Sequence, residues 1–303
     1  MTLTRKEFLK TSSLIAGGFF LPLSNNFGRM FQQSAGNFKT IRDNVGIYTE
    51  KGGTIGWYVS DDAVVVIDSQ YADTAKHMFE GLQKKTSRKI DMLFNTHHHG
   101  DHTSGNVFLK DHAERIIAQE NCKALQEKSY GGDPAKPQAY PTATFKKEWN
   151  QVIGKETVSA KFFGAAHTGG DSVVHFQNAN IAHMGDLVFN RTYPYIDSNG
   201  GGSVEAWPIV LERIINYYHK DTIFIFGHGA SDELVTGSMA DLTAMKNYLS
   251  ALIEFVSAEI KAGKSKELIA SAGEIPGFGD LKERWAGARK MNLEKTYDEL
   301  SAK

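Results

Sequence analysis

The sequence lacks paired cysteines, because Cys122 is the only cysteine among its 303 residues. A disulfide bond within one chain is therefore excluded, and the fold does not depend on one even in an oxidising compartment. We interpret Cys122 as a buried small side chain rather than a metal ligand.

The sequence also lacks a basic cluster. Its 34 Lys and Arg residues are balanced by 35 Asp and Glu residues, which gives a formal net charge of -1. A nucleic-acid substrate normally requires a basic groove. We therefore expect a small-molecule substrate and no nucleic-acid partner.

A long hydrophobic run is missing as well. The most apolar segment near the N-terminus, residues 14–23, is short and is interrupted by Gly17, Gly18 and Pro22. A membrane-spanning helix needs about 20 predominantly apolar residues, so we expect no stable membrane span.

The same segment belongs to an N-terminal leader. Residues 4–10, TRKEFLK, resemble the twin-arginine export motif, with Lys6 in place of one arginine. The pattern predicts that residues 1–35 are a signal peptide and leader, and that the protein is exported to the periplasm or beyond the cell. Removing this leader, with four basic residues and one acidic residue, moves the formal net charge from -1 to -4.

The remaining residues, 36–303, have the composition of one catalytic domain, since the chain is 41% hydrophobic and 23% charged. Strand-like and helix-like patterns alternate along its first half. The strand-like runs are 54–58, 63–68, 92–95 and 115–118, and the helix-like segments are 71–82, 104–110 and 121–128. Further strands follow a proline-rich loop at 131–137, then helices near 204–217 and 238–262, and a mostly helical tail. This order predicts a layered α/β fold.

The most informative motif follows the strand-like run at 92–95. It holds five potential metal ligands within six residues, namely His97, His98, His99, Asp101 and His102. Alternate residues of an extended segment point the same way, so His97 and His99 can converge on one ion while His98 points away. Asp101 and His102 can then turn toward a second ion. The motif predicts two metals rather than a solvated polar loop.

Three further ligand candidates lie where strand-like runs end. His167 follows the run at 158–163 and lies in a glycine-bounded loop. Asp186 follows another apolar run, and His228 stands between two glycines directly after the run at 222–226. Glycine neighbours leave room for an ion or a ligand beside the histidine.

This ordered set resembles the metallo-β-lactamase superfamily over nearly the whole chain after the leader. The resemblance implies a four-layer αββα sandwich, with metals held by loops along one edge of two sheets, and a helical C-terminal region. It places His97, His99 and His167 on a first metal, Asp101, His102 and His228 on a second, and Asp186 as a bridge between them. It gives Asp68, after the strand-like run at 63–67, the role of accepting a hydrogen bond and orienting the ligand loop.

The resemblance also implies a reaction. Asp186 stands where other β-lactamase branches use Cys or His, and this resembles the glyoxalase II and lactonase branch. The implied enzyme is a hydrolase with two Zn²⁺ per chain, with iron or manganese as alternatives. A metal-bridging hydroxide would cleave an ester, lactone, thioester or amide, including a β-lactam. Asp101 is expected to be catalytic as well as a ligand, because it would hold that hydroxide in line.

Substrate selection is assigned to the loop at 187–202, which combines aromatic residues, Arg191 and a glycine run. Arg191 is expected to receive a substrate carboxylate or to pair with Asp197. Tyr193 loosely resembles a lactonase tyrosine that donates to the substrate carbonyl, and a packed aromatic ring is the alternative.

Two other functions fit the same ligands. One is an iron-dependent oxidoreductase of sulfur compounds, and the other is a non-catalytic zinc-binding protein. The complete ligand set argues against the second. The sequence leaves the substrate, the native metal and the oligomeric state open.

Overall fold

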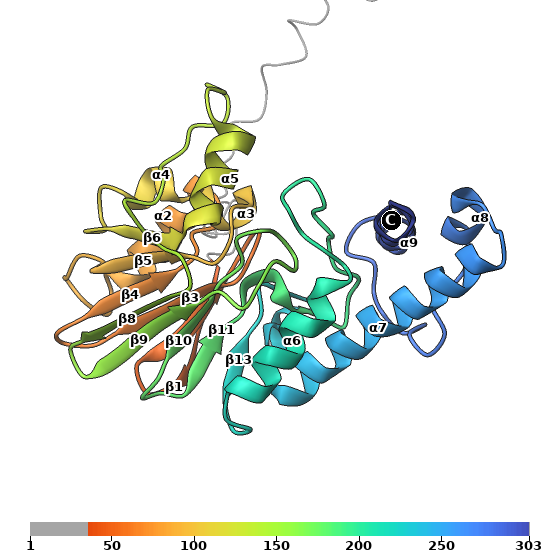
Figure 1. The fold of residues 1–303 in the computed structure, drawn as a ribbon. Helices are drawn as coiled ribbons and strands as arrows, with labels where there is room; N and C mark the ends of the chain where they lie inside the picture. The colour runs from red at the N-terminus through yellow and green to blue at the C-terminus, as the bar shows by residue number, and fades with distance from the viewer. Residues whose placement is uncertain (1–35, 303) are drawn as a thin grey trace, which may run out of the picture. The chain divides into compact units, whose positions relative to one another are not determined.

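The computed structural model describes residues 36–302, and Figure 1 shows their arrangement. The predicted export leader at 1–35 lies outside the described residues. In the described part of the chain, no helix is both long enough and apolar enough to cross a membrane.

The first sheet has seven strands that are neighbours in chain order. They are β1 (Asn37–Arg42), β2 (Val45–Thr49), β3 (Ile55–Val59), β4 (Val64–Ile67), β5 (Met92–Asn95), β6 (Ile116–Gln119) and β7 (Ala143–Phe145). Pairing is antiparallel from β1 to β4 and parallel from β4 to β7. The parallel strands therefore end at a common edge, where the 97–102 motif begins.

The second sheet has six strands in the order β15-β13-β11-β10-β9-β8. Their bounds are β8 (Glu148–Ile153), β9 (Glu156–Lys161), β10 (Val173–Phe176), β11 (Ile181–His183), β13 (Ile223–Ile225) and β15 (Thr236–Gly237). A separate short pair joins β12 (Phe189–Asn190) to β14 (His228–Gly229) in parallel. This pair brings the segment after Asp186 beside His228.

Helices cover the outer face of each sheet (Figure 1). On the first sheet lie α2 (Ala72–Leu82), α3 (Gly100–Thr103), α4 (Asn106–Leu109) and α5 (Glu120–Tyr130), and on the second lie α6 (Ala206–Tyr217) and α7 (Met239–Lys261). Apolar residues, which include Ile67, Phe94 and Phe176, fill the space between the two sheets. The predicted αββα sandwich is therefore confirmed.

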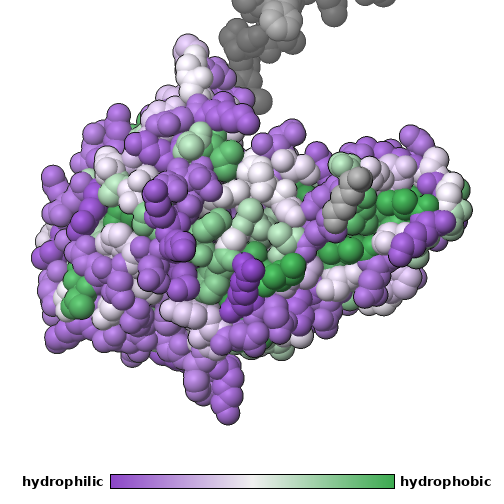
Figure 2. Space-filling model, in the orientation of Figure 1, coloured by the Kyte–Doolittle hydropathy of each residue, from purple (hydrophilic) through white to green (hydrophobic). Residues whose placement is uncertain are grey.

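The burial of individual strands follows from these layers. All four residues of β4 are buried, because a helix layer covers one face and the second sheet covers the other. In Figure 2 the visible surface is mostly hydrophilic, with hydrophobic residues gathered near its centre and over the C-terminal helices.

The C-terminal region is helical at two places, α8 (Lys266–Ala270) and α9 (Ala288–Ser301). The connection at 271–287 is not helical, although a mostly helical tail was expected. It contains Pro276 and four glycines, which disfavour a continuous helix.

Phe176 tests the packing between the sheets. Its side chain is fully buried and its ring lies 5.9 Å from that of Tyr58. We expect Phe176→Ala to lower the free energy of unfolding by about 3–5 kcal/mol in a denaturant titration. Val152→Ala on β8 is the control, because Val152 is 70% exposed, and its effect should stay within about 0.5 kcal/mol. Equal effects of the two variants would contradict the assigned layers.

Candidate metal centre

The seven predicted ligands come together at one edge of the sandwich. The 97–102 segment leaves β5, His167 lies in the loop between β9 and β10, and Asp186 lies in a short 3-10 turn, η2 (Gly185–Leu187), after β11. His228 follows β13. The backbone N–H of Gly227 donates to the carbonyl of Gly185 at 2.7 Å, which joins the last two segments. A Cβ at position 227 would lie 2.0 Å from Asp186 Oδ1, so glycine is required there.

The first group consists of His97, His99, His167 and Asp186, whose potential ligand atoms all lie within 4.8 Å of one another. His99 Nδ1 is 3.1 Å from His97 Nε2 and 3.0 Å from His167 Nε2. Asp186 Oδ2 lies 3.6 Å from His167 Nε2 and 3.9 Å from His97 Nε2.

The second group consists of Asp101, His102 and His228. His228 Nε2 lies 3.0 Å from Asp101 Oδ2, and His102 Nε2 lies 3.7 Å from the same oxygen. Asp186 also reaches this group, since its Oδ1 is 3.1 Å from His102 Nε2 and its Oδ2 is 3.4 Å from His228 Nε2. The Asp186 carboxylate therefore lies between the two groups.

Asp68 fixes the orientation of both groups from a fully buried position. Its carboxylate accepts the backbone N–H and the hydroxyl of Thr96, both at 2.8 Å. It also accepts a hydrogen bond from His102 Nδ1 at 2.7 Å. Because the Thr96 hydroxyl proton is used in this way, Thr96 Oγ1 accepts from His97 Nδ1 at 3.1 Å.

The hydrogen bonds of the first group leave three nitrogen lone pairs facing one another. His97 donates through Nδ1, His167 donates from Nδ1 to the carbonyl of Tyr195 at 2.8 Å, and His99 donates from Nε2 to Asp197 at 2.8 Å. Each ring therefore turns its unprotonated nitrogen inward. Burial lowers the pKa of His97, and it lowers that of His167 to about 3, so both rings are neutral.

A cation fits this arrangement. Lone pairs about 3 Å apart cannot hydrogen-bond to one another, and neutral imidazoles are the form that binds a metal. The buried atoms His102 Nε2 and Asp186 Oδ1 lie 3.1 Å apart without hydrogen-bond geometry between them, and neither has another hydrogen-bond partner among residues 36–302. Burial opposes ionisation of Asp186, but His228 and His102 lower the pKa of its carboxyl group well below the ordinary value.

His98 does not join the first group. Its Nε2 lies 3.5 Å from Asp197 Oδ2, the same oxygen that His99 Nε2 approaches at 2.8 Å. Asp197 itself was not predicted as a partner of the ligands. It binds His99, whereas Arg191 lies 3.8 Å from Asp241. The expected pairing of Arg191 with Asp197 is therefore wrong.

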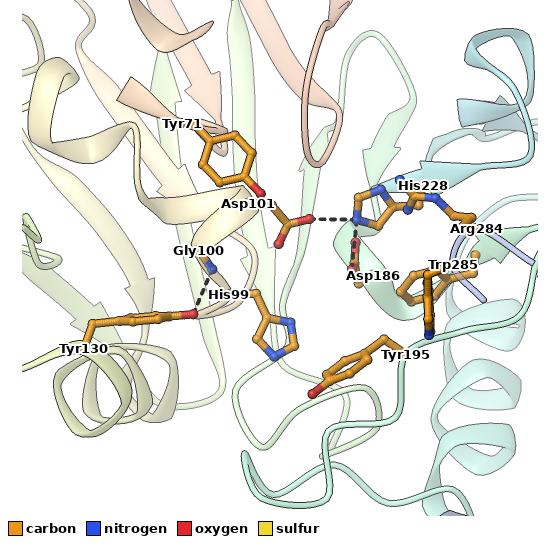
Figure 3. A pocket seen from close by; sticks show the side chains of 11 residues that line it. Tyr71, His99, Gly100, Asp101, Tyr130, Asp186, Tyr195, His228, Arg284 and Trp285 are labelled. Atoms are coloured by element: carbon orange, nitrogen blue, oxygen red, sulfur yellow. Dashed lines mark hydrogen bonds and ion pairs between the residues drawn. The ribbon is translucent and has the colours of Figure 1, made fainter. Parts of the chain in front are cut away.

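A cavity of about 480 Å³ opens beside the two groups (Figure 3). Its lining residues are Tyr71, His99, Gly100, Asp101, Tyr130, Asp186, Phe189, Tyr195, His228, Arg284 and Trp285. Asp101 is one of them, and its side chain is 27% exposed. Phe189 and Tyr195 come from the loop at 187–202 that was expected to select the substrate, whereas Tyr71, Tyr130, Arg284 and Trp285 had not been singled out from the sequence.

Arg191 and Tyr193 do not line this cavity. Arg191 lines a separate, smaller hollow beside α7, and Tyr193 is 2% exposed with its ring 5.8 Å from that of Tyr248. The alternative reading of Tyr193 as a packed aromatic ring matches this position. Both residues were expected to contact a substrate at the ligand cluster, but neither side chain lines the cavity beside that cluster.

Comparisons with known proteins agree with the architecture. The family model described as Metallo-beta-lactamase superfamily matches residues 48–228. A metallo-beta-lactamase type 2 from Bacillus cereus is 24% identical over 62% of this chain and 75% of its own length. The solved structure of a metallo-beta-lactamase from Pontibacter korlensis covers 71% of this chain and 99% of its own, at 18% identity and a TM-score of 0.60.

A third similar protein extends further along the chain. The structure of a double mutant of a sec-alkyl sulfatase covers 88% of this chain and 50% of its own, at 14% identity and a TM-score of 0.69. At this level of sequence identity, the similarity concerns the fold alone.

Asp68→Asn tests the orienting carboxylate. Asn tolerates the positive φ of 64° at this position, but its amide group can no longer accept all three hydrogen bonds. We expect zinc affinity to fall by about 10–100-fold in a competition titration with a chromophoric chelator, with an unchanged circular dichroism spectrum.

The control is Asp73→Asn, which removes an exposed carboxylate that pairs with Lys51. It should bind zinc like the unmodified protein. Undiminished zinc affinity of Asp68→Asn would show that Asp68 does not orient the ligands.

Proposed function

Because this chain belongs to the metallo-beta-lactamase superfamily, we propose that it is an exported hydrolase that works with two zinc ions. The observation that carries the proposal is the convergence of histidine ring nitrogens on the Asp186 carboxylate from two sides. One tetrahedral zinc needs at most four protein ligands, and seven are available.

Each residue has a role in this proposal. His97, His99 and His167 hold the first ion, Asp101, His102 and His228 hold the second, and Asp186 bridges both. The bridging role is supported by the position of its two oxygens, one 3.1 Å from His102 Nε2 and the other 3.6 Å from His167 Nε2. The bridging position of Asp186 is also the reason for proposing that the enzyme belongs to the glyoxalase II-like and lactonase-like branch.

When bound, two such ions would supply a water-derived nucleophile at neutral pH and polarise the bond to be cleaved. The chain's own groups position the substrate and handle protons. Burial favours the neutral form of Asp101, but His102 and His228 lower the pKa of its carboxyl group below the ordinary value. The resulting carboxylate, exposed to the cavity, is the group proposed to orient the attacking water.

Tyr130 is a second group with a proton at the cavity. Its oxygen accepts the backbone N–H of Gly100 at 3.0 Å, which leaves the hydroxyl proton free to point into the cavity. Burial raises the pKa of Tyr130, so the phenol remains protonated. A hydrogen bond from this phenol to the substrate is part of the proposal.

The proposed substrate is a small molecule with an ester, lactone, thioester or amide bond. A cavity of about 480 Å³ suits a molecule of this size. The name of the Bacillus cereus relative, a metallo-beta-lactamase, supports hydrolysis by this kind of site.

Asp186→Ala tests the bridge. Removing a shared ligand disturbs both ion sites, so we expect the loss of about one metal equivalent and a fall in hydrolysis of at least roughly 100-fold. Metal content is measured by mass spectrometry and turnover with a chromogenic ester. Asp221→Ala, which removes a side chain that is 71% exposed, should change neither. If Asp186→Ala keeps both metals and near-normal turnover, the bridge and the proposed branch are both wrong.

Export is tested separately. If Arg5 and Lys6 are the core of a twin-arginine signal, changing both to Ala should leave folded precursor in the cytoplasm. Cell fractionation followed by immunoblotting measures this. Unchanged export of the double variant would point to a different secretion route.

A further inference from the structure

One wall of the cavity comes from the irregular connection between α8 and α9, which lies beyond residues 48–228 that match the family. It contributes Arg284 and Trp285, and Figure 3 shows both on the same side of the cavity as His228. The residues that match the family therefore supply the ligand cluster. The separate segment supplies part of the wall around the space that a substrate would fill.

The segment is held in place by the backbone after β12. Lys282 N donates to the carbonyl of Arg191 at 3.1 Å, and the Lys282 carbonyl accepts from Thr192 Oγ1 at 2.6 Å and from Tyr193 N at 3.1 Å. These three bonds fix the chain two residues before Arg284. A fixed backbone favours a specific binding role over that of a freely moving surface loop.

The Arg284 side chain is exposed, and it lines both this cavity and a neighbouring hollow whose lining includes Glu50 and Asp232. Its guanidinium makes no hydrogen bond or ion pair with any residue from 36 to 302. The adjacent Glu283 is already used, since its carboxylate accepts the backbone N–H groups of Gly287 and Arg289 at the start of α9. Arg284 is the only Lys or Arg side chain among the described residues that line this cavity.

Arg284 and Tyr71 line the same cavity. Burial raises the pKa of Tyr71 and the nearby Asp101 raises it further, while His102 and then Arg284 lower it. Beside the arginine, the ring of Trp285 lies 6.2 Å from that of Tyr195, and His99 lies 5.6 Å from Tyr195 on the other side. An aromatic surface therefore leads from the arginine toward the ligand cluster.

We propose that the substrate carries an anionic group, separate from the bond that is cleaved, which binds the Arg284 guanidinium. Its apolar or aromatic body packs against Trp285 and Tyr195. A guanidinium binds carboxylate or sulfonate oxygens through paired N–H donors, which favours such a group over a neutral one. This inference rests on the proposed hydrolase function, and it names the class of substrate for that same site.

The test compares two esters with the same leaving group, the para-nitrophenyl hemiester of glutarate and the neutral para-nitrophenyl valerate. Zinc-loaded protein should prefer the hemiester in kcat/KM. In Arg284→Gln we expect this preference to fall by about tenfold or more, mainly through a higher KM for the hemiester, because a charge-assisted hydrogen bond is lost. Arg284→Lys should retain part of the preference, since it keeps the charge but not the paired donors.

Lys282→Gln is the matched control. It removes a positive charge two residues before Arg284, and the Lys282 side chain does not line the cavity. It should leave the preference unchanged. An equal loss in both variants, or an unchanged preference in Arg284→Gln, would overturn the inference.

A binding measurement separates this inference from the proposed function. Calorimetry with benzoate and neutral benzamide on zinc-loaded protein should show tighter binding of benzoate, and Arg284→Gln should weaken benzoate binding by about tenfold. Failure to hydrolyse either ester would count against the proposed reaction. Equal benzoate binding by the wild type and Arg284→Gln would count against the role of Arg284, whatever the turnover.

Discussion

The hydrogen bonds accepted by Asp68 are the interaction on which the rest of the site depends. This fully buried carboxylate accepts from Thr96 and His102, and through Thr96 it sets the orientation of His97. One residue at the end of β4 therefore controls a histidine in each ligand group. Burying a charge is costly unless it is hydrogen-bonded, and here all three hydrogen bonds come from the ligand loop. The carboxylate links the stability of the core to the geometry of the site.

The sandwich explains why the other ligands can meet there. Strands β4, β5 and β6 run parallel and end at one edge, and β11 and β13 of the second sheet run parallel to each other. The glycine at 227 then allows the backbone after β13 to approach the Asp186 carboxylate. Ligands that are distant in sequence converge because each one follows a strand that ends at the same edge.

These parts of the fold and the site could be predicted from the sequence, because the patterns that indicate them are local. The β5 strand was predicted with the bounds observed, and the ligand motif follows it directly. Each histidine and aspartate of the cluster was identifiable from its spacing or from its place after an apolar run. The helices near 71–82 and 238–262 agree with α2 and α7 within one residue at each end, because their amphipathic patterns are long.

The cavity wall was not predictable in the same way. The pairing of Thr192 with Lys282 joins segments 90 residues apart, and neither segment has a periodic pattern. Arg191 looked like the substrate-binding cation because it follows Asp186 closely in the chain, yet its side chain turns toward Asp241 and its backbone anchors Lys282. Asp197 was likewise assigned to the wrong partner, since its contact with His99 depends on how the loop at 187–202 folds back.

The central claim, that two groups of ligands share Asp186, is tested most directly by counting and locating the metal. Purified mature protein, loaded with zinc and freed of excess ions, should contain about two zinc ions per chain by elemental mass spectrometry, because seven ligands exceed the needs of one tetrahedral ion. Anomalous X-ray scattering at the zinc edge should give two peaks, one on each side of Asp186. A single ion that stays single in excess zinc, with one anomalous peak, would contradict the account.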